Sequence, residues 1–270
     1  MMKPCISQAC LFSSSFAEDV KGFLEGGCNA MEVWLTKLEK HLETSSVGQT
    51  KTLLADHGIE CPAASYQGGL LFSEGEQKKL HLDHFRKRLD LCQGLGIPVM
   101  NILAEFPQRV DQETMQRAIR ALGEAAQWAE AFGTRLSLEF RARSPFVNNL
   151  ETALAFVNAT GASNLGVTVD FFHFHCGPSK LSDIQGPVID KIFLVQVCDL
   201  MSTTREMATD SDRILPGDGE LPLKPFIQSL KDSGYHGFVS VEVFNPMLSQ
   251  TSPGQIAEFG MGSVQRFLTA

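Results

Sequence analysis

The chain has 270 residues, of which 43% are hydrophobic, and its formal net charge is −8. This length and apolar content allow a large buried core in one α/β domain or two small ones. An acidic chain without a basic run repels phosphate backbones, so we expect no nucleic-acid partner. No segment has the apolar length of a membrane span or of a signal peptide, so we expect no membrane association.

Seven cysteines are scattered singly along the chain, at positions 5, 10, 28, 61, 92, 176 and 198. An odd number without paired spacing is typical of reduced thiols. Because the start of the chain also lacks a signal-like segment, we expect a cytoplasmic protein.

Short apolar runs recur along the chain and alternate with amphipathic stretches and turn formers. We find eight such runs, at residues 5–10, 30–35, 61–66, 99–104, 136–140, 165–171, 192–198 and 238–244. Strands that alternate with helices through short connections are typical of a parallel sheet. Eight units predict a closed (β/α)8 TIM barrel rather than an open, doubly wound sheet.

Helical spacing supports this interpretation between the runs. In residues 111–132 an apolar stripe follows the helical period, and Gly133 is placed to end the helix. Residues 255–268 can form a closing helix. No proline- or serine-rich linker divides the chain, so we predict one domain over residues 1–270. The longest irregular stretch is 199–222, and a connection of that length is expected to cover a site.

The last four strand-like runs each carry an oxygen ligand at or near their carboxyl ends: Glu139, Asp170, Gln196 and Glu242. Side chains alternate faces along a strand, so Glu139 shares a face with Ser137 while Leu136 lies on the opposite face. In a barrel these ends meet at one mouth, where the active site lies.

Each of these four residues, taken singly, could be a capping or salt-bridging residue. Three carboxylates that converge in one mouth, however, repel one another unless a cation or protons lie between them. We therefore predict one divalent metal ion held by Glu139, Asp170, Gln196 and Glu242. An oxygen-only ligand set favours Mn or Mg, with Co or Zn as further candidates.

With these ligands and the 170–173 run Asp-Phe-Phe-His, the whole chain resembles the xylose isomerase-like TIM-barrel superfamily, or sugar phosphate isomerase/epimerase family. That group contains sugar isomerases, ketose 3-epimerases, inosose and dehydroshikimate dehydratases, and endonuclease IV. The resemblance implies a metal-dependent isomerase or epimerase that acts on a ketose, a sugar acid or a related polyol. Glu139 and Glu242 would remove and return a proton next to a metal-bound carbonyl, through an enediolate.

One departure keeps a second function open. Most members of the family have histidine where this chain has Gln196, and glutamine there is similar to dehydroshikimate dehydratases. A metal-dependent dehydratase, of the 3-dehydroshikimate or inosose type, is therefore the alternative.

Four further residues are candidates for binding the carbohydrate-like substrate. His173 and Arg213 resemble family residues that hold substrate oxygens. Trp34 could form an apolar wall against a sugar ring or pack in the core. Glu105 could join the polar rim or form a surface salt bridge. Either Arg141 or Arg143 could reach an anionic group of the substrate.

Two other functions are less well supported by the residues. An endonuclease would need further metal ligands, typically histidines, at the ends of strands two to four, where Trp34, Gln67 and Glu105 stand. A barrel that binds a ligand without catalysis would not need all four metal-site residues. The resemblance also leaves room for a homodimer.

Overall fold

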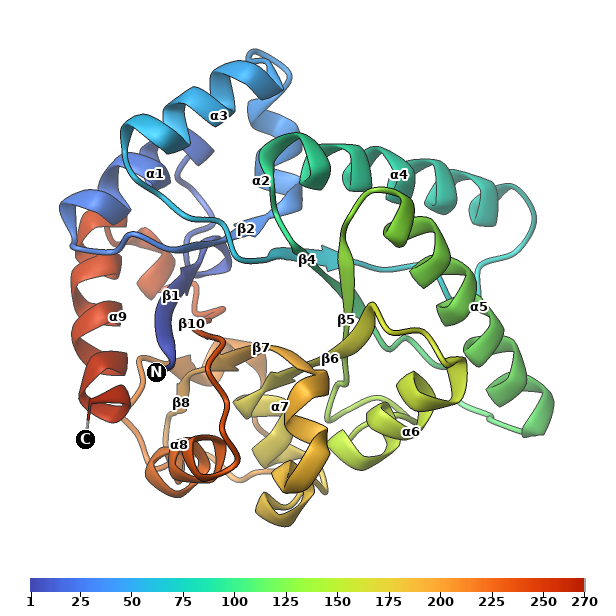
Figure 1. The fold of residues 1–270 in the computed structure, drawn as a ribbon. Helices are drawn as coiled ribbons and strands as arrows, with labels where there is room; N and C mark the ends of the chain where they lie inside the picture. The colour runs from blue at the N-terminus through green and yellow to red at the C-terminus, as the bar shows by residue number, and fades with distance from the viewer. Residues whose placement is uncertain (270) are drawn as a thin grey trace.

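The structure is a computed structural model that describes residues 1–269. Eight strands within these residues close into a parallel barrel in the order β1-β10-β7-β6-β5-β4-β3-β2 (Figure 1). The strands are β1 (Lys3–Ser7), β2 (Met31–Trp34), β3 (Ala64–Gln67), β4 (Val99–Leu103), β5 (Arg135–Glu139), β6 (Leu165–Asp170), β7 (Ile192–Val197) and β10 (Phe238–Val241). The predicted (β/α)8 fold is confirmed.

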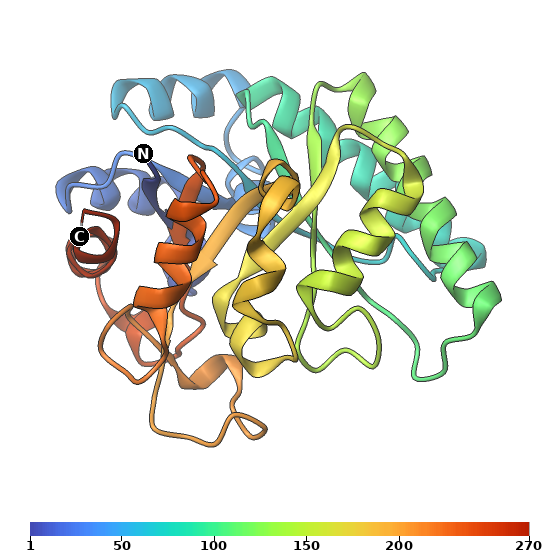
Figure 2. The same ribbon diagram turned by 60° about the horizontal axis from the view of Figure 1, so that its bottom comes forward.

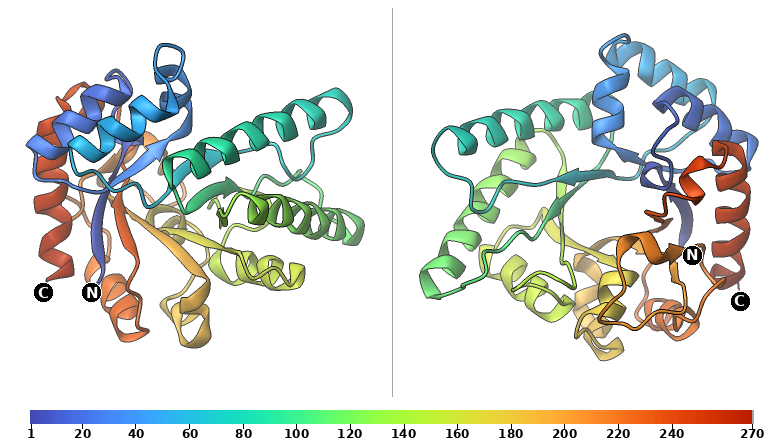
Figure 3. Two further views of the ribbon diagram at one scale, coloured as in Figure 1. Left: turned by 45° about the horizontal axis from the view of Figure 1, so that its top comes forward. Right: turned by 180° about the vertical axis from the view of Figure 1, so that it is seen from behind.

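Helices surround the strands on the outside of the barrel (Figure 1). They are α1 (Phe16–Glu25), α2 (Leu35–His41), α3 (Val47–Asp56), α4 (Gly75–Leu95), α5 (Gln112–Ala131), α6 (Leu150–Thr160), α7 (Phe171–Cys176), α8 (Leu223–Asp232) and α9 (Pro253–Leu268). The long helices α4 and α5 lie on the same side of the barrel (Figure 3). No helix among residues 1–269 is long and apolar enough to cross a membrane.

Local sequence signals fix the helix ends. Asp111 caps α5 by accepting a hydrogen bond from the Thr114 N–H at 2.8 Å, so the predicted helix over 111–132 is confirmed with its cap. Ser15 and Glu18 form a capping box at the start of α1. Gly96, with φ of 74°, lets the chain leave α4 through a left-handed residue.

The barrel closes where the two ends of the chain meet. β1 pairs with β10, and α9 packs against α1. Gly22 and Gly26 lie one turn apart on α1, so both face α9. A Cβ on Gly22 would lie 2.5 Å from the Pro253 side chain, and one on Gly26 would lie 2.4 Å from the Gly254 carbonyl oxygen. Only glycine allows this close approach of the two helices.

The strand bounds differ from the predicted runs in places. β1 ends at Ser7 because residues Gln8–Cys10 form a turn of 3₁₀ helix (η1), and the Ser7 hydroxyl accepts a hydrogen bond from the Ala9 N–H. β3 begins at Ala64 rather than at residue 61. Residues 8–10 and 61–63 are buried like strand residues, and all of them except Gln8 are apolar, so hydrophobicity alone did not separate them.

The stretch 199–222, expected to be irregular, contains a two-stranded antiparallel sheet of β8 (Asp199–Leu200) and β9 (Arg213–Ile214), together with the short 3₁₀ turn η4 (Asp210–Asp212). This segment, coloured orange, extends from one end of the barrel (Figure 2). The buried Asp199 carboxylate accepts hydrogen bonds from the N–H groups of Gly217 and Leu221, both at 2.8 Å. These bonds fold the segment back toward the barrel.

Candidate functional site

The four predicted metal-site residues come together at the carboxyl ends of β5, β6, β7 and β10. Their exposed fractions are 7% for Glu139, 0% for Asp170, 0% for Gln196 and 3% for Glu242. Asp170 and Gln196 are register partners on neighbouring strands. Glu139 and Glu242 line a cavity of about 260 Å³, the mouth cavity, whose other lining residues are Tyr66, Leu103, Arg141, His173, Asp210, Arg213 and Phe244.

Arg213 pairs with the buried carboxylates from above. Its Nη1 lies 2.7 Å from Asp170 Oδ2 and 3.6 Å from Glu242 Oε2, and its Nε donates to Asp210 Oδ1 at 3.0 Å. The guanidinium also stacks on Phe172, at 4.3 Å from the ring centroid. Arg213 is 1% exposed, so the predicted substrate-binding arginine lies in the site but its donors are taken up by protein carboxylates.

His173 lies among the same acids. Its Nε2 is 3.6 Å from Glu139 Oε1 and 4.0 Å from Asp170 Oδ2, and its Nδ1 is buried without a hydrogen-bond partner. One ligand atom from each of Glu139, Asp170 and His173 lies within 4.8 Å of the others. The helix α7 places His173 here because it starts directly after Asp170, whose carboxylate caps it through the Phe172 N–H.

A fifth acid, Glu32 on β2, joins the site from the other side of the barrel. The Gln196 Nε2 group donates to Glu32 Oε1 at 2.8 Å and to Glu242 Oε1 at 2.9 Å. The Ser65 hydroxyl also donates to Glu32 Oε1. Glu32 is 0% exposed, and the sequence analysis gave it no role. The local sequence signal for Glu32 is a carboxylate within the otherwise apolar run Met31–Trp34.

Two more buried polar residues hold the carboxylates in place. The Asn101 side-chain amide donates to Glu139 Oε2 at 2.5 Å, and the Ser7 hydroxyl donates to Glu242 Oε1 at 3.4 Å. Asn101 lies inside the otherwise apolar strand β4, a pattern like that of Glu32 on β2. We did not predict Asn101 and Glu32 as site residues, because they reach the site from β4 and β2, strands that carry none of the four predicted ligands.

Burial and mutual repulsion shift the acidities of these groups. Burial, and next the charge of Asp170, raise the pKa of Glu139 to about 8. Burial and the carboxylates of Glu32, Glu139 and Asp170 raise the pKa of Glu242 well above its ordinary value. Burial lowers the pKa of His173 to about 4, so its imidazole is neutral at pH 7.

The donor set fits a divalent cation. The buried acids repel one another, and a cation between them would relieve this repulsion without protonation. The Gln196 Oε1 atom is buried and has no hydrogen-bond partner among the described residues, so it is available as a ligand. Oxygen atoms from Glu139, Asp170, Gln196 and Glu242, with the neutral His173 beside them, suit Mn²⁺, Mg²⁺, Co²⁺ or Zn²⁺.

The other two predicted substrate-binding residues lie farther out. Trp34 packs edge-on against Phe12, with ring centroids 6.2 Å apart, and does not line the mouth cavity. Glu105 is exposed and accepts a hydrogen bond from the Gly69 N–H at 2.5 Å. It lines a second cavity of about 320 Å³, the side cavity, which shares Arg141, His173 and Asp210 with the mouth cavity.

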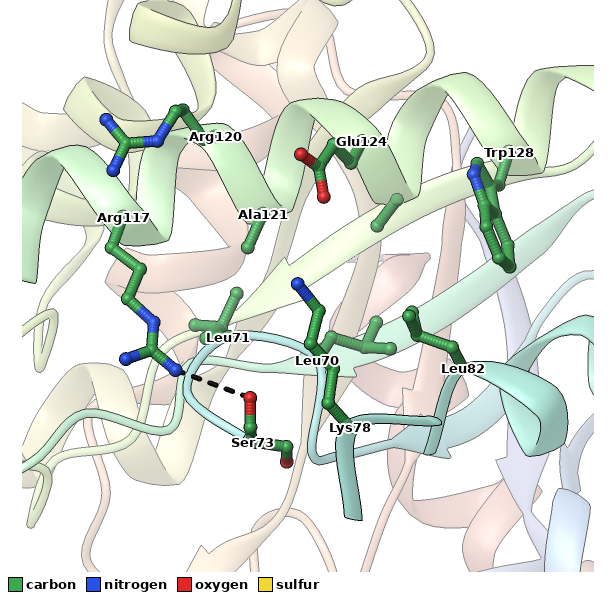
Figure 4. A pocket seen from close by; sticks show the side chains of 11 residues that line it. Leu70, Leu71, Ser73, Lys78, Leu82, Arg117, Arg120, Ala121, Glu124 and Trp128 are labelled. Carbon is green, nitrogen blue, oxygen red and sulfur yellow. Dashed lines mark hydrogen bonds between the residues drawn. The ribbon is translucent and has the colours of Figure 1, made fainter. Parts of the chain in front are cut away.

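Another cavity, of about 170 Å³, lies on the outer surface between α4, α5 and the connection from β3 (Figure 4). Leu70, Leu82 and Trp128 form its apolar side, and the Lys78 and Arg117 side chains point into it. It shares no lining residue with the mouth or side cavity, so it is separate from the carboxylate site.

Known proteins are similar to this chain over most of its length. An inosose isomerase of Halalkalibacterium halodurans is 29% identical over 259 residues, which are 93% of this chain and 91% of that protein. A 3-dehydroshikimate dehydratase of Pseudomonas putida is 26% identical over 263 residues, 93% of this chain and 40% of that longer protein.

A crystal structure of the IolI protein with a bound zinc atom superposes with a TM-score of 0.92 and 23% identity, and the match covers 99% of this chain and 98% of that one. At this identity, the likeness shows the fold. The sequence profile of the xylose isomerase-like TIM barrel family matches residues 24–266. The chain therefore belongs to the xylose isomerase-like TIM-barrel family.

Proposed function

We propose that this protein is a divalent-metal-dependent isomerase or epimerase that transfers a proton next to the carbonyl of a polyhydroxylated substrate. The observation that carries the proposal is the placement of Glu139 and Glu242 in one cavity, on strands separated by β6 and β7. Two carboxylates on different sides of one bound carbon can remove a proton and return it. The similarity to inosose isomerases over most of both chains supports this reaction class.

The chain's own residues have distinct parts in this proposal. Glu139, Asp170, Gln196 and Glu242 would hold the metal ion, with His173 at its edge. When bound, a dication supplies Lewis acidity that makes the C–H next to a coordinated carbonyl more acidic. Asn101 donates a hydrogen bond to Glu139 Oε2, while Glu139 Oε1 lies 3.6 Å from His173 Nε2. This orientation leaves Oε1 to act as the base.

His173 would provide a hydrogen-bonding group, and Arg213 a positive charge, next to the carbons that react. The neutral imidazole of His173 can donate or accept a hydrogen bond from a substrate hydroxyl, because burial keeps it unprotonated at neutral pH. Arg213 donates a hydrogen bond to Asp170 Oδ2 at 2.7 Å and so places a positive charge next to the site. The burial of both the His173 and the Arg213 side chains keeps most water away from them.

A dehydratase is the second candidate, and Gln196 is the observation that favours it. Loss of water from a cyclic keto-polyol begins with the same proton removal, so the two reactions can use the same acids. The similarity to a 3-dehydroshikimate dehydratase supports this candidate. Growth of ultraviolet absorbance with the substrate distinguishes dehydration from isomerisation, which conserves the elements of the substrate.

The test is proton exchange into ketoses and keto-cyclitols in deuterated water, followed by NMR, with protein whose metal content is measured. We expect exchange in the Mn²⁺-loaded wild type. Glu139→Gln and Glu242→Gln should each reduce it by a factor of about 100 or more, because a positioned acid or base contributes that much. The circular dichroism spectra of both variants should match that of the wild type.

Glu124→Gln is the matched control, because it makes the same carboxylate-to-amide change on the outer helix α5. It should exchange like the wild type. Exchange at the wild-type rate in metal-loaded Glu139→Gln or Glu242→Gln would contradict the proposed acid–base role of that residue. A wild-type protein that takes up no divalent metal would contradict the proposal as a whole.

A further inference from the structure

Arg141 stands between the mouth cavity and the side cavity and lines both. It follows Glu139 by two residues, directly after the end of β5. Its side chain is 45% exposed, so its guanidinium can meet a ligand that enters either cavity. His173 and Asp210 also line both cavities, which makes them continuous at this point.

The guanidinium of Arg141 has donors to spare. Its ion pair with Asp210 joins Nη2 to Oδ2 at 3.9 Å, which is longer than a hydrogen bond. Asp210 already accepts from Arg213 Nε at 3.0 Å through its other oxygen. Among residues 1–269, this 3.9 Å pair is the one direct polar contact of the Arg141 side chain.

The other two arginines of the cavities are already engaged. Arg213 is buried and donates to Asp170 and Asp210. Arg143 donates through Nη2 to the carbonyl oxygens of Ala208 at 2.6 Å and Glu206 at 3.4 Å, so it holds the loop that walls the side cavity. Arg141 is therefore the guanidinium that a substrate can reach.

We propose that Arg141 binds a carboxylate of the substrate, so that the protein acts on an anionic polyhydroxylated ketone whose acid group lies at the junction with the side cavity. The inference rests on the proposed function, because it takes the reacting carbons to lie between Glu139 and Glu242. A planar guanidinium with free donors matches a carboxylate by two parallel hydrogen bonds. A phosphate dianion fits less well, since Glu105 and Asp210 add negative charge to the side cavity.

The test uses two cyclic polyols that cannot react, quinate with a carboxylate and myo-inositol without one. Calorimetry with Mn²⁺-loaded protein should give a lower Kd for quinate than for myo-inositol. Arg141→Gln should raise the Kd of quinate by about 10-fold or more, as expected for a charge-assisted hydrogen-bonded pair, and leave that of myo-inositol unchanged. Arg120→Gln, the same change on the outer face of α5, should leave both unchanged.

Equal affinity of wild type and Arg141→Gln for quinate, or no measurable binding of quinate, would overturn the inference. myo-Inositol 1-phosphate provides the phosphate arm. Tighter binding of that ligand than of quinate, lost in Arg141→Gln, would replace the carboxylate with a phosphate and so overturn the stated class. Proton exchange without a quinate preference refutes the inference alone. A quinate preference in a protein that exchanges no substrate proton refutes the proposed function alone.

Discussion

The amide of Gln196 shows how a single side chain can present two different chemistries to one site. The amide nitrogen of Gln196 faces Glu32 and Glu242 and donates a hydrogen bond to a carboxyl oxygen of each. The carbonyl oxygen then faces elsewhere, and it is buried without a partner among the described residues. Glu32 thus holds the Gln196 amide in the orientation that its proposed role as a ligand requires, although Glu32 lines neither the mouth cavity nor the side cavity.

Glu32→Gln tests this orientation. A neutral amide at position 32 can donate as well as accept, so Gln196 would lose its reason to keep one orientation. We expect the affinity for Mn²⁺ to fall by about 10- to 100-fold, the range seen when an outer-shell partner of a ligand is removed. Calorimetric titration of metal-free protein measures it, with Glu124→Gln as the control. An unchanged Kd would contradict the role of Glu32.

At the level of secondary-structure elements, the segment between β7 and α8 decides what lies over the carboxylate site. β8 and β9 pair within it, and β9 begins with Arg213, whose guanidinium reaches Asp170 on β6. Asp199 anchors the base of this segment through the N–H groups of Gly217 and Leu221. Gly219 must be glycine, because a Cβ there would lie 2.3 Å from the Leu200 carbonyl oxygen.

Asp199→Ala should loosen the attachment of the segment between β7 and α8 to the barrel. It removes three hydrogen bonds that the buried Asp199 carboxylate accepts, from the N–H groups of Leu200, Gly217 and Leu221, each contributing about 1.5–3 kcal/mol. We expect the Tm to fall by roughly 10–20 °C, given the usual conversion for a chain of this size. Limited proteolysis should then cut within residues 200–220 faster than in the wild type. The control is Asp190→Ala, an exposed acid on the short helix η3 (Gly186–Lys191). Equal cleavage rates in both variants would show that Asp199 does not anchor the segment.

At the scale of the whole molecule, the barrel buries the carboxyl groups of Glu32, Glu139, Asp170 and Glu242 together, and Arg213 pairs with two of them. The pKa of Glu139 in the folded protein, about 8, lies above its ordinary value of 4.5. A group with a raised pKa contributes stability that is full below its unfolded pKa and is lost as the pH rises through the folded value. The metal-free protein should therefore become less stable as the pH rises from 4.5 to 8. His173, whose pKa is about 4, is mainly neutral throughout this window.

This predicts a different pH dependence of the Tm for the metal-free and the metal-bound protein. The Tm of the metal-free protein should fall from pH 6 to pH 8.5, and saturating Mn²⁺ should remove most of that fall, because the ion stabilises the charged carboxylates. The affinity for Mn²⁺ should rise over the same range as protons leave the site. Scanning calorimetry with and without metal measures both trends. A metal-free Tm that stays flat or rises toward pH 8.5 would contradict the acidities of Glu139 and Glu242.

How much the sequence could predict differs between the fold and the site. The period-two alternation in 135–139 and the helical stripe in 111–132 are local signals, and both elements formed where expected. The bounds of β1 and β3 were less well predicted, because buried turns are as apolar as strands. The β8–β9 pairing carried no local pattern, since each strand has two residues.

The sequence by itself determined the barrel and brought Glu139, Asp170, Gln196 and Glu242 to one mouth, because parallel strands in a closed barrel end at the same face. Only the tertiary structure decided that Glu32 contacts Gln196, 164 positions away, and that Arg213 pairs with Asp170. The first contact crosses the barrel, and the second is made by a residue on the long connection between β7 and α8. They depend on strand register, closure and side-chain orientation together, and none of these is written in a local stretch of sequence.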